Sequence, residues 1–165
     1  MHVSEWMSLT PITVARETTV AAAWNIMREK EIRHLPVCDT GRLVGIVSER
    51  DILRALPSPL TSLSPGEIRY VLDSVTVDGL MTRPVITIAP GATVADAVEL
   101  LLANRIGALP VTASDRLLGI ITETDLLSAF ASRMGEAAEL HDRPRSPAGR
   151  PTLATRPGVM RDERI

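Results

Sequence analysis

The chain has 165 residues, of which 45% are hydrophobic and 2% aromatic, and its formal net charge is -2 at pH 7. This length and apolar content suffice for a compact core, whereas the few aromatic rings and the negative charge argue against a nucleic-acid binder. Cys38 is the only cysteine, which excludes an internal disulfide and a cysteine-rich zinc cluster. An acidic residue near the N-terminus and the lack of a long apolar run predict a cytoplasmic protein without a signal peptide or membrane span.

The first predicted elements are a short extended segment, PITV at residues 11–14, and a helix that follows it. The helix is predicted because apolar residues recur at the spacing i, i+3, i+4 and i+7, which places them on one face. These residues are Val20, Ala23, Trp24 and Met27. Two short apolar strands come next, HLPVC (34–38) and LVGIV (43–47), because the stretch DTGR between them is typical of a turn. A last helix is expected to start at Ser48.

The same order of elements recurs further along the chain. We expect an extended segment VITI (85–88), followed by a helix whose apolar face contains Val94, Ala97, Val98 and Leu101. Two strands, ALPVT (108–112) and LLGII (117–121), and a helix from Thr122 are expected next. Between the two sets, residues 57–76 are rich in proline and serine and then helical from Glu67 to Leu72, which predicts a linker. Residues 133–165 have many prolines and arginines and few periodic apolar residues, so we expect a disordered tail.

The two sets of elements are copies of one another. With a shift of 74 residues, Val3–Leu53 aligns with Val77–Leu127 without a gap, and 20 of the 51 positions are identical. Two copies of a unit this long predict a duplication, at residues 1–56 and 77–132, whose halves bury one another's apolar faces. The predicted fold class is α/β, of the α+β kind, with two β-α-β-β-α repeats whose helices pack on small sheets.

Each copy contains the motif G-x-x-[ST]-x-x-D, as GIVSERD from residue 45 and GIITETD from residue 119. One interpretation is helix capping, since Ser48 with Asp51 and Thr122 with Asp125 match a capping box worth about 1 kcal/mol. The other is ligand binding, since a helix N-terminus beside a glycine can admit an anion, and the carboxylate can accept hydrogen bonds from ribose hydroxyls. The motif leaves both interpretations open, although its duplication in register favours a site.

The motif and the LPV that precedes it in both copies resemble the cystathionine-β-synthase (CBS) domain, and the tandem resembles a Bateman module from Val3 to about Phe130. The stretches TSLSPGEIRYVL, EIRHLPV and RIGALPV are similar to the acetoin-utilisation type. The resemblance implies a pseudo-twofold pair of repeats with clefts between them for adenosine-containing ligands such as AMP, ADP, ATP or S-adenosylmethionine. It also implies a homodimer, no covalent cofactor, and a regulatory or sensor role toward an effector protein in trans.

The resemblance further implies which residues contact the ligand. Asp51 and Asp125 match the family's ribose-binding acid, and Ser48 and Thr122 match the hydroxyl beside it. The other matching positions are Thr13 and Thr87 at the adenine edge, Arg33 and His34 before LPV as phosphate contacts, Arg50 and Thr124 beside the acid, Pro36 and Pro110 within LPV, and Gly107 and Ala108, which leave space in the second copy. Because the copies differ at several of these positions, the two sites are not expected to be equivalent.

An enzyme is the competing function class, and the sequence disfavours it. Of three histidines, one is residue 2 and another, His141, lies in the tail, while the two motif acids would lie in separate clefts and could not act as a pair. No metal site is predicted, because Cys38 and His34 would supply only two ligands. A structural dimerisation module without ligand remains open. A homodimer is expected because Ile52, Leu53, Leu126, Leu127, Ala129 and Phe130 leave more apolar surface than one module covers.

Overall fold

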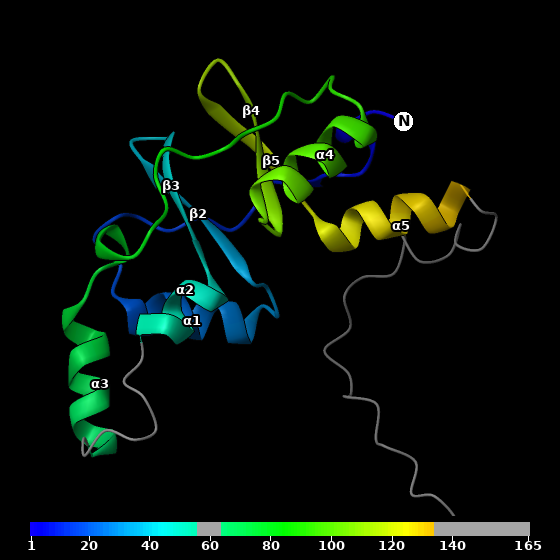
Figure 1. Cartoon of the computed structure of the whole chain (residues 1–165). Helices are drawn as coiled ribbons and strands as arrows, with labels where there is room; N and C mark the ends of the chain where they lie inside the picture. Colours follow the sequence, from blue (N-terminus) through cyan, green and yellow to red (C-terminus); the bar gives the residue numbers. More distant parts are fainter. Residues whose placement is uncertain (56–63, 134–165) are drawn as a thin grey trace, which may run out of the picture.

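The computed structural model describes residues 1–55 and 64–133, which form two similar units, each with a β-hairpin and two helices (Figure 1). The first unit contains α1 (Val20–Glu29), β2 (His34–Asp39), β3 (Arg42–Ser48) and α2 (Glu49–Ala55). The second contains α4 (Val94–Asn104), β4 (Ala108–Ala113), β5 (Arg116–Thr122) and α5 (Glu123–Arg133). The two hairpins, the four helices and the α/β fold class predicted from the sequence are confirmed.

Both hairpins belong to one five-stranded sheet. β2 pairs antiparallel with β3, and β4 pairs with β5 in the equivalent register. β5 also pairs with the short β1 (Ser8–Leu9) and meets β3 where Arg116 lies opposite Arg42. The two units therefore join along β3 and β5, and their helices lie outside this junction (Figure 1).

The predicted extended segment PITV forms a single bridge instead of a strand, and a proline in β2 explains why. The N–H of Val14 donates to the Pro36 carbonyl (3.1 Å), and the Val14 carbonyl accepts from the N–H of Cys38 (2.9 Å). The preceding bond of a parallel ladder would need an N–H at residue 36 to reach the carbonyl of Ile12. Proline has no N–H, so the ladder stops there.

The segment VITI behaves in the same way in the second unit. Ile88 bridges to Val111, its N–H donates to the Pro110 carbonyl (3.1 Å), and its carbonyl accepts from Thr112 (3.0 Å). Pro110 ends the ladder before it reaches the carbonyl of Ile86. In both units the proline of LPV therefore leaves one backbone carbonyl of the extended segment without a strand partner.

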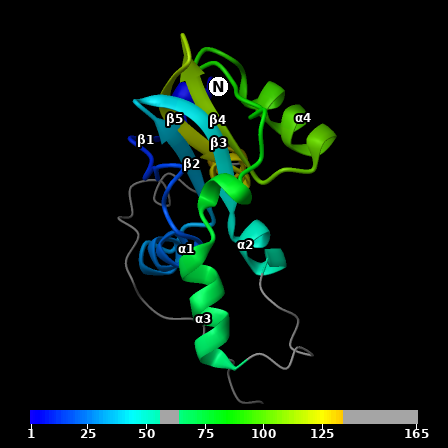
Figure 2. The ribbon, with the colours of Figure 1, turned by 90° about the vertical axis from the view of Figure 1, so that its left-hand side faces the viewer.

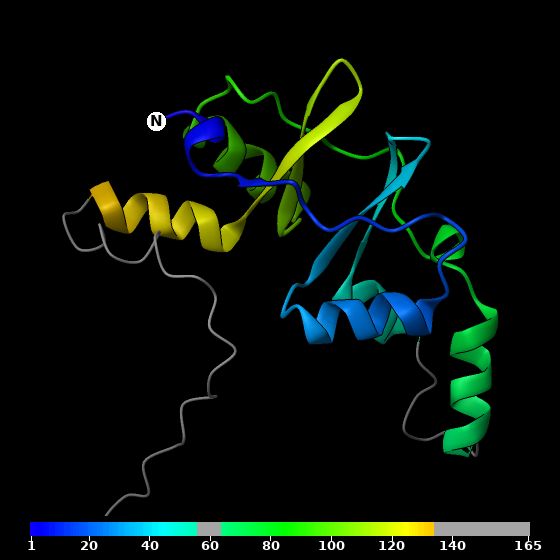
Figure 3. The same cartoon turned by 180° about the vertical axis from the view of Figure 1, so that it is seen from behind.

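The two units exchange their leading segments. The 3-10 helix η1 (Val3–Glu5) precedes the first unit in the sequence, yet Val3 is fully buried in the core of the second. The 3-10 helix η2 (Val77–Gly79) precedes the second unit, and Val77 is fully buried in the core of the first. Figure 3 shows the blue N-terminal segment beside α4 before it runs on toward α1. Each core is thus completed by chain from the other side of the duplication.

The linker contains the helix α3 (Pro65–Ser74), which is longer than the predicted stretch from Glu67 to Leu72. It begins earlier because Ser64 caps it: the Glu67 N–H donates to Ser64 Oγ (3.3 Å), and the Ser64 N–H donates to Glu67 Oε2 (2.7 Å). Figure 2 shows α3 extending below the sheet beside α1. The remainder of the predicted linker up to residue 63, and the predicted tail beyond Arg133, lie outside the described residues.

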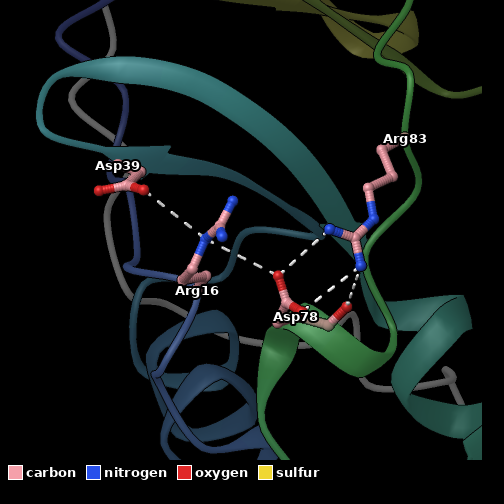
Figure 4. A network of polar contacts seen from close by, with 4 residues as sticks. All are labelled: Arg16, Asp39, Asp78 and Arg83. Carbon is pink, nitrogen blue, oxygen red and sulfur yellow. Dashed lines mark hydrogen bonds and ion pairs between the residues drawn. The ribbon is translucent and has the colours of Figure 1, made fainter.

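A polar network ties η2 to the first unit (Figure 4). Arg16 Nε lies 3.8 Å from a carboxylate oxygen of both Asp39 and Asp78, and Asp78 also pairs with Arg83 at 3.4 Å. Under the 74-residue shift these positions become Pro90, Ala113, Ser4 and Leu9, so only one half carries the network. Because each side chain is more than a third exposed, the network adds little to stability and mainly orients the chain.

The apolar surface predicted at the ends of α2 and α5 is smaller than expected. Ile52 and Ala129 are fully buried and Leu126 is 7% exposed, because these three face the cores. Leu53, Leu127 and Phe130 are the exposed members of the set, at 50%, 68% and 62%. In the described part of the chain, no helix has both the length and the apolar character needed to cross a bilayer.

Candidate functional site

Two clefts lie between the units, and we name each after its motif hydroxyl. The Ser48 cleft has a volume of about 400 Å³ and the Thr122 cleft about 510 Å³, within the range of small-molecule sites. The Thr122 cleft is lined by Ser8, Leu9, Thr10, Pro11, Ile12, Glu31, Ile32, Arg33, His34, Ile120, Thr122 and Thr124. The Ser48 cleft is lined by the residues that the 74-residue shift aligns with these, with the single exception of the counterpart of Leu9. The clefts are therefore equivalent in position.

Each cleft takes one wall from each unit. In the Thr122 cleft, residues 8–12 and 31–34 come from the first unit and face the end of β5 and the start of α5. In the Ser48 cleft, residues 82, 84–86 and 105–108 come from the second unit and face the end of β3 and the start of α2. A molecule bound in either cleft would contact both units.

Both motifs form capping boxes. The N–H and hydroxyl of Ser48 donate to Asp51 Oδ2 (2.8 and 2.6 Å), and the Asp51 N–H donates to Ser48 Oγ (3.2 Å). Thr122 and Asp125 make the same three bonds at 2.8, 2.7 and 3.4 Å. In each box the other carboxylate oxygen, Oδ1, makes no hydrogen bond with the described residues, so it can accept one from a ligand. Capping and ligand binding are therefore compatible.

The glycine of each motif does not admit a ligand, contrary to the expectation from the sequence. A Cβ at position 45 would collide with the side chain of Met81, whose Sδ is nearest and whose Cγ would be 2.8 Å away. Met81 is buried and belongs to the segment that the second unit contributes to the first core. Gly45 thus makes room for a core methionine, and its role is packing between the units.

The clefts bring together most of the predicted site residues. Ser48, Arg50, Asp51, Gly107 and Ala108 line the Ser48 cleft, Thr122 and Thr124 line the Thr122 cleft, and Arg33 and His34 line both. The other predicted residues line neither cleft: Thr13 and Thr87 are exposed, Pro36 and Pro110 are fully buried, and Asp125 is half-buried and bonded to Thr122.

Several charged residues that line the clefts were not among the predicted site residues. Arg54 and Glu49 on α2, Arg105 at the end of α4, and Glu123 at the start of α5 line the Ser48 cleft, and Glu31 lines the Thr122 cleft. Arg54 could have been found as the residue one turn beyond Arg50 on the same helix face. Arg105 and Glu31 precede LPV by the same distance, and their opposite charges are visible in the alignment of the two copies.

Isoleucines form matching apolar walls in the two clefts. The Thr122 cleft contains Ile12, Ile32 and Ile120, and the Ser48 cleft contains their counterparts Ile86, Ile106 and Ile46. Ile12 and Ile86 are the residues whose carbonyls the prolines leave without a strand partner. Each cleft thus has an apolar wall of three isoleucines, one of which keeps a carbonyl without a strand partner, and these groups suit an aromatic ring that carries an amino group.

His34 stands between the clefts. Its ring lies close to Gly107, where a Cβ would be 3.2 Å from both Cε1 and Nε2. Burial is the main cause that lowers the pKa of His34. The positive charges of Arg33 and Arg50 lower this pKa further, whereas the negative charges of Glu123 and Asp51 raise it. The imidazole is therefore held mainly neutral near pH 7, and a bound anion would raise its pKa.

The described residues contain no group of three or more His, Cys, Asp or Glu side chains that could hold a metal ion. Cys38 is half-buried on β2, and burial raises the pKa of its thiol. A thiol held in this state is a weak nucleophile and a weak metal ligand.

The family model of the CBS domain matches residues 3–58 and 77–132. The chain belongs to the CBS domain family. It is a tandem CBS pair, and it is 34% identical over 144 residues to protein MJ1426 of Methanocaldococcus jannaschii, covering 73% of this chain and 86% of that protein. The chain spans only 36% of MJ1225 from the same organism and 21% of the inosine-5'-monophosphate dehydrogenase of Thermoplasma acidophilum, so some relatives carry the pair within longer proteins.

Solved CBS structures share the fold. An acetoin utilization protein, AcuB, from Vibrio cholerae is 30% identical with a TM-score of 0.67, and the match covers 82% of this chain and 93% of that one. The CBS pair of protein MJ0100, in complex with 5'-methylthioadenosine and S-adenosyl-L-methionine, is 27% identical with a TM-score of 0.68, over 81% and 98% of the two chains. CBSX2, in complex with AMP, is 28% identical with a TM-score of 0.66 over the same shares.

Proposed function

We propose that this CBS pair is a regulatory module that binds adenosine-containing ligands in its two clefts and passes their occupancy to a partner protein in the cytosol. The proposal is carried by one arrangement, which occurs twice: the motif hydroxyl of one repeat faces the extended segment and the residues before LPV of the other. Similar CBS pairs crystallised with AMP, 5'-methylthioadenosine and S-adenosyl-L-methionine, which all contain adenosine, support it.

The cleft residues match the parts of adenosine. The three isoleucines of each cleft can hold the adenine ring, and the carbonyl of Ile12 or Ile86 can accept a hydrogen bond from its amino group. The free Oδ1 of Asp51 in the Ser48 cleft can accept a hydrogen bond from a ribose hydroxyl, and we propose the same role for Asp125, which is bonded to the cleft residue Thr122. Arg33 and His34, which line both clefts, can contact a phosphate.

A ligand in either cleft would contact both repeats, which gives binding a route to regulation. Occupancy shifts the arrangement of the repeats only if the ligand prefers one arrangement over another. Because the exchanged segments couple the two cores, such a shift would move the outer helices of both repeats together. We therefore propose that the partner recognises the outer surface of the pair.

A homodimer is part of the proposal, and a dimerisation module without ligand is the second candidate function. Leu53, Leu127 and Phe130 are exposed on α2 and α5, and burial of these side chains between two copies would remove them from water. We propose no enzymatic reaction, because the motif acids belong to separate clefts and each is held in a capping box.

A thermal-shift panel with AMP, ADP, ATP and S-adenosylmethionine tests the proposed function. A ligand present at a hundredfold its Kd stabilises the folded state by about 2.7 kcal/mol, which raises the melting temperature by several degrees. We expect at least one adenosine ligand to do so, with GTP and CTP as base controls. A dimer that responds to none of the adenosine ligands would instead support the dimerisation module.

A further inference from the structure

The Ser48 cleft is rich in arginine and the Thr122 cleft is not. Four arginines, Arg33, Arg50, Arg54 and Arg105, line the Ser48 cleft together with three carboxylates. Among the described residues that line the Thr122 cleft, Arg33 is the only arginine or lysine and Glu31 the only acidic residue. The two clefts therefore differ in their electrostatic character although they are equivalent in position.

The difference arises at three pairs of aligned positions. Arg50 corresponds to Thr124, Arg54 to Ser128, and Arg105 to Glu31. At the first two pairs an arginine is replaced by a hydroxyl residue, and at the third the charge is reversed. The capping boxes and the isoleucine walls, in contrast, are preserved in both clefts. The two clefts thus share the residues proposed to bind adenosine. They differ in the residues that would contact the group attached to adenosine, such as a phosphate chain.

The four guanidinium groups of the Ser48 cleft have no anionic partner in the described part of the chain. None of them makes an ion pair or a side-chain hydrogen bond there, although Glu49, Asp51 and Glu123 line the same cleft. Arg16 and Arg83 outside the cleft do make such pairs. The arginines of the cleft are therefore available to an anionic ligand.

These arginines come from both repeats and from three separate parts of the chain. Arg50 and Arg54 lie on one face of α2, about 6 Å apart along the helix axis. Arg105 reaches the cleft from the other repeat, at the left-handed residue that ends α4 (φ 53°). A single phosphate held by Arg33 and Arg50 would leave Arg54 and Arg105 unused, whereas a chain of two or three phosphates could engage all four.

We infer that the Ser48 cleft is the site for an adenine nucleotide with two or three phosphates, and that the Thr122 cleft takes an adenosine ligand with one phosphate or none. This inference rests on the proposed function and adds a division of ligands between its two sites. In the Thr122 cleft a longer phosphate chain would meet Glu31 instead of an arginine, and like charges repel. Arg54 and Arg105 are thus the specificity-determining residues, and both repeats contribute to the polyphosphate site.

Calorimetric titration of the full chain with ATP, AMP and 5'-methylthioadenosine tests the division. In the double variant Arg54→Gln/Arg105→Gln we expect ATP affinity to fall about tenfold or more, since charge-assisted hydrogen bonds are lost, and the affinity for 5'-methylthioadenosine to change less than twofold. Arg116→Gln is the matched control, because Arg116 is exposed at the tip of the β4–β5 hairpin, away from both clefts. It should leave every affinity unchanged.

A gain-of-charge variant tests the same inference in the opposite direction. Glu31→Arg/Thr124→Arg gives the Thr122 cleft the charges of the Ser48 cleft at two of the three differing positions. We expect ATP to bind two sites per chain in this variant and one site in the natural chain. Both positions are exposed, so the variant should fold, which its melting curve without ligand checks.

The outcomes separate this inference from the function on which it rests. If adenosine ligands bind but the ratio of ATP to AMP affinity is the same in the natural chain and in both double variants, the division of ligands is wrong and the proposed function stands. If no adenosine ligand binds the natural chain, both are wrong. A loss of ATP binding in the first double variant together with a second ATP site in the other supports the division.

Discussion

Met7 packs against Gly119 so closely that a Cβ at position 119 would lie 2.8 Å from its Sδ and 2.8 Å from the carbonyl oxygen of Ser8. The contact joins the exchanged N-terminal segment to β5, and Met81 makes the equivalent contact with Gly45 on β3. Met7 and Met81 are themselves aligned by the 74-residue shift. The glycines repeated in the two motifs are therefore explained by the exchange of segments between the units.

Alanine at either glycine should destabilise the fold, but only at position 45 should a second substitution restore part of the lost stability. We expect Gly45→Ala and Gly119→Ala to lower the free energy of unfolding by about 1–3 kcal/mol, since an added methyl group overpacks the junction. At position 45 the obstacle is only a side chain, so Gly45→Ala should be partly compensated by Met81→Ala. At position 119 the Ser8 backbone also obstructs, so Met7→Ala should not compensate Gly119→Ala. Urea unfolding of the four single and two double variants measures both coupling energies.

Additivity at position 45 would contradict this packing account. If the effects of Gly45→Ala and Met81→Ala simply add, the two residues do not interact, and the glycine must be explained in another way. The Gly119 pair is the internal comparison, because it differs chiefly in the backbone contact.

The hairpins and helices could be predicted because their periodicity is local, whereas the exchange of segments could not. Val3 and Val77 are identical residues at aligned positions, so either one could fill either core, and the sequence does not distinguish an exchanged from an unexchanged pair. The single bridges at Val14 and Ile88 were likewise missed, although the prolines that limit them are visible in LPV. Predicting them requires knowledge of which N–H groups face the extended segment.

The candidate site was predicted best where one motif supplies neighbouring residues. Ser48, Arg50 and Asp51 lie within one turn, and the structure places all three at one cleft. Arg105 was missed because it reaches that cleft from the other unit, and its sequence distance from Ser48 carries no information on contact. The predicted Thr13 and Thr87 do not line the clefts, whereas their neighbours Ile12 and Ile86 do, because alternate residues of an extended segment face opposite sides.

Removal of the capping hydroxyls should separate stability from ligand binding. Ser48→Ala and Thr122→Ala should each lower the free energy of unfolding by about 1 kcal/mol, because each removes an N-cap. Thr93→Ala is the matched control, since Thr93 caps α4 through the same box with Asp96 and is remote from both clefts. We expect all three to melt at similarly lowered temperatures, with ligand affinity reduced only in the first two. Equal affinities in all three would leave the hydroxyls with a capping role alone.

The stability of the protein should depend on pH through His34. Its pKa in the folded state is lowered, chiefly by burial and then by Arg33, so the unfolded chain binds the proton more readily. The free energy of unfolding should therefore decrease as the pH falls through the ordinary histidine pKa of 6.5. His34→Gln should remove this part of the pH dependence in urea titrations at pH 8, 7, 6 and 5, while His2 and His141 remain in both proteins. An unchanged pH profile in the variant would show that His34 is not the group responsible.

The exposed apolar side chains on α5 should hold the proposed homodimer together. Leu127→Lys/Phe130→Lys is expected to give a monomer in light scattering at micromolar concentration, with the melting temperature of the monomer little changed because both residues are exposed. Leu102→Lys is the control, since Leu102 is 72% exposed on α4, outside the set on α2 and α5. A natural chain that is already monomeric, or a double variant that stays dimeric, would contradict this assignment of the interface.

The most direct test of adenosine binding in the clefts is a calorimetric titration of Asp51→Asn, Asp125→Asn and Asp96→Asn with ATP and AMP. All three aspartates accept the N–H of a capping residue at 2.8 Å, but Asp96 belongs to an exposed box far from the clefts. Asparagine keeps one oxygen for the cap and replaces the other with a donor, so a ribose hydroxyl loses a charge-assisted bond worth about 1.5 to 3 kcal/mol. We predict that Asp51→Asn lowers the affinity for ATP about tenfold or more, that Asp125→Asn lowers the affinity for AMP by a similar factor, and that Asp96→Asn lowers neither. If the first two variants bind both nucleotides as tightly as the natural chain does, the aspartates serve only their helices and the proposed sites are wrong.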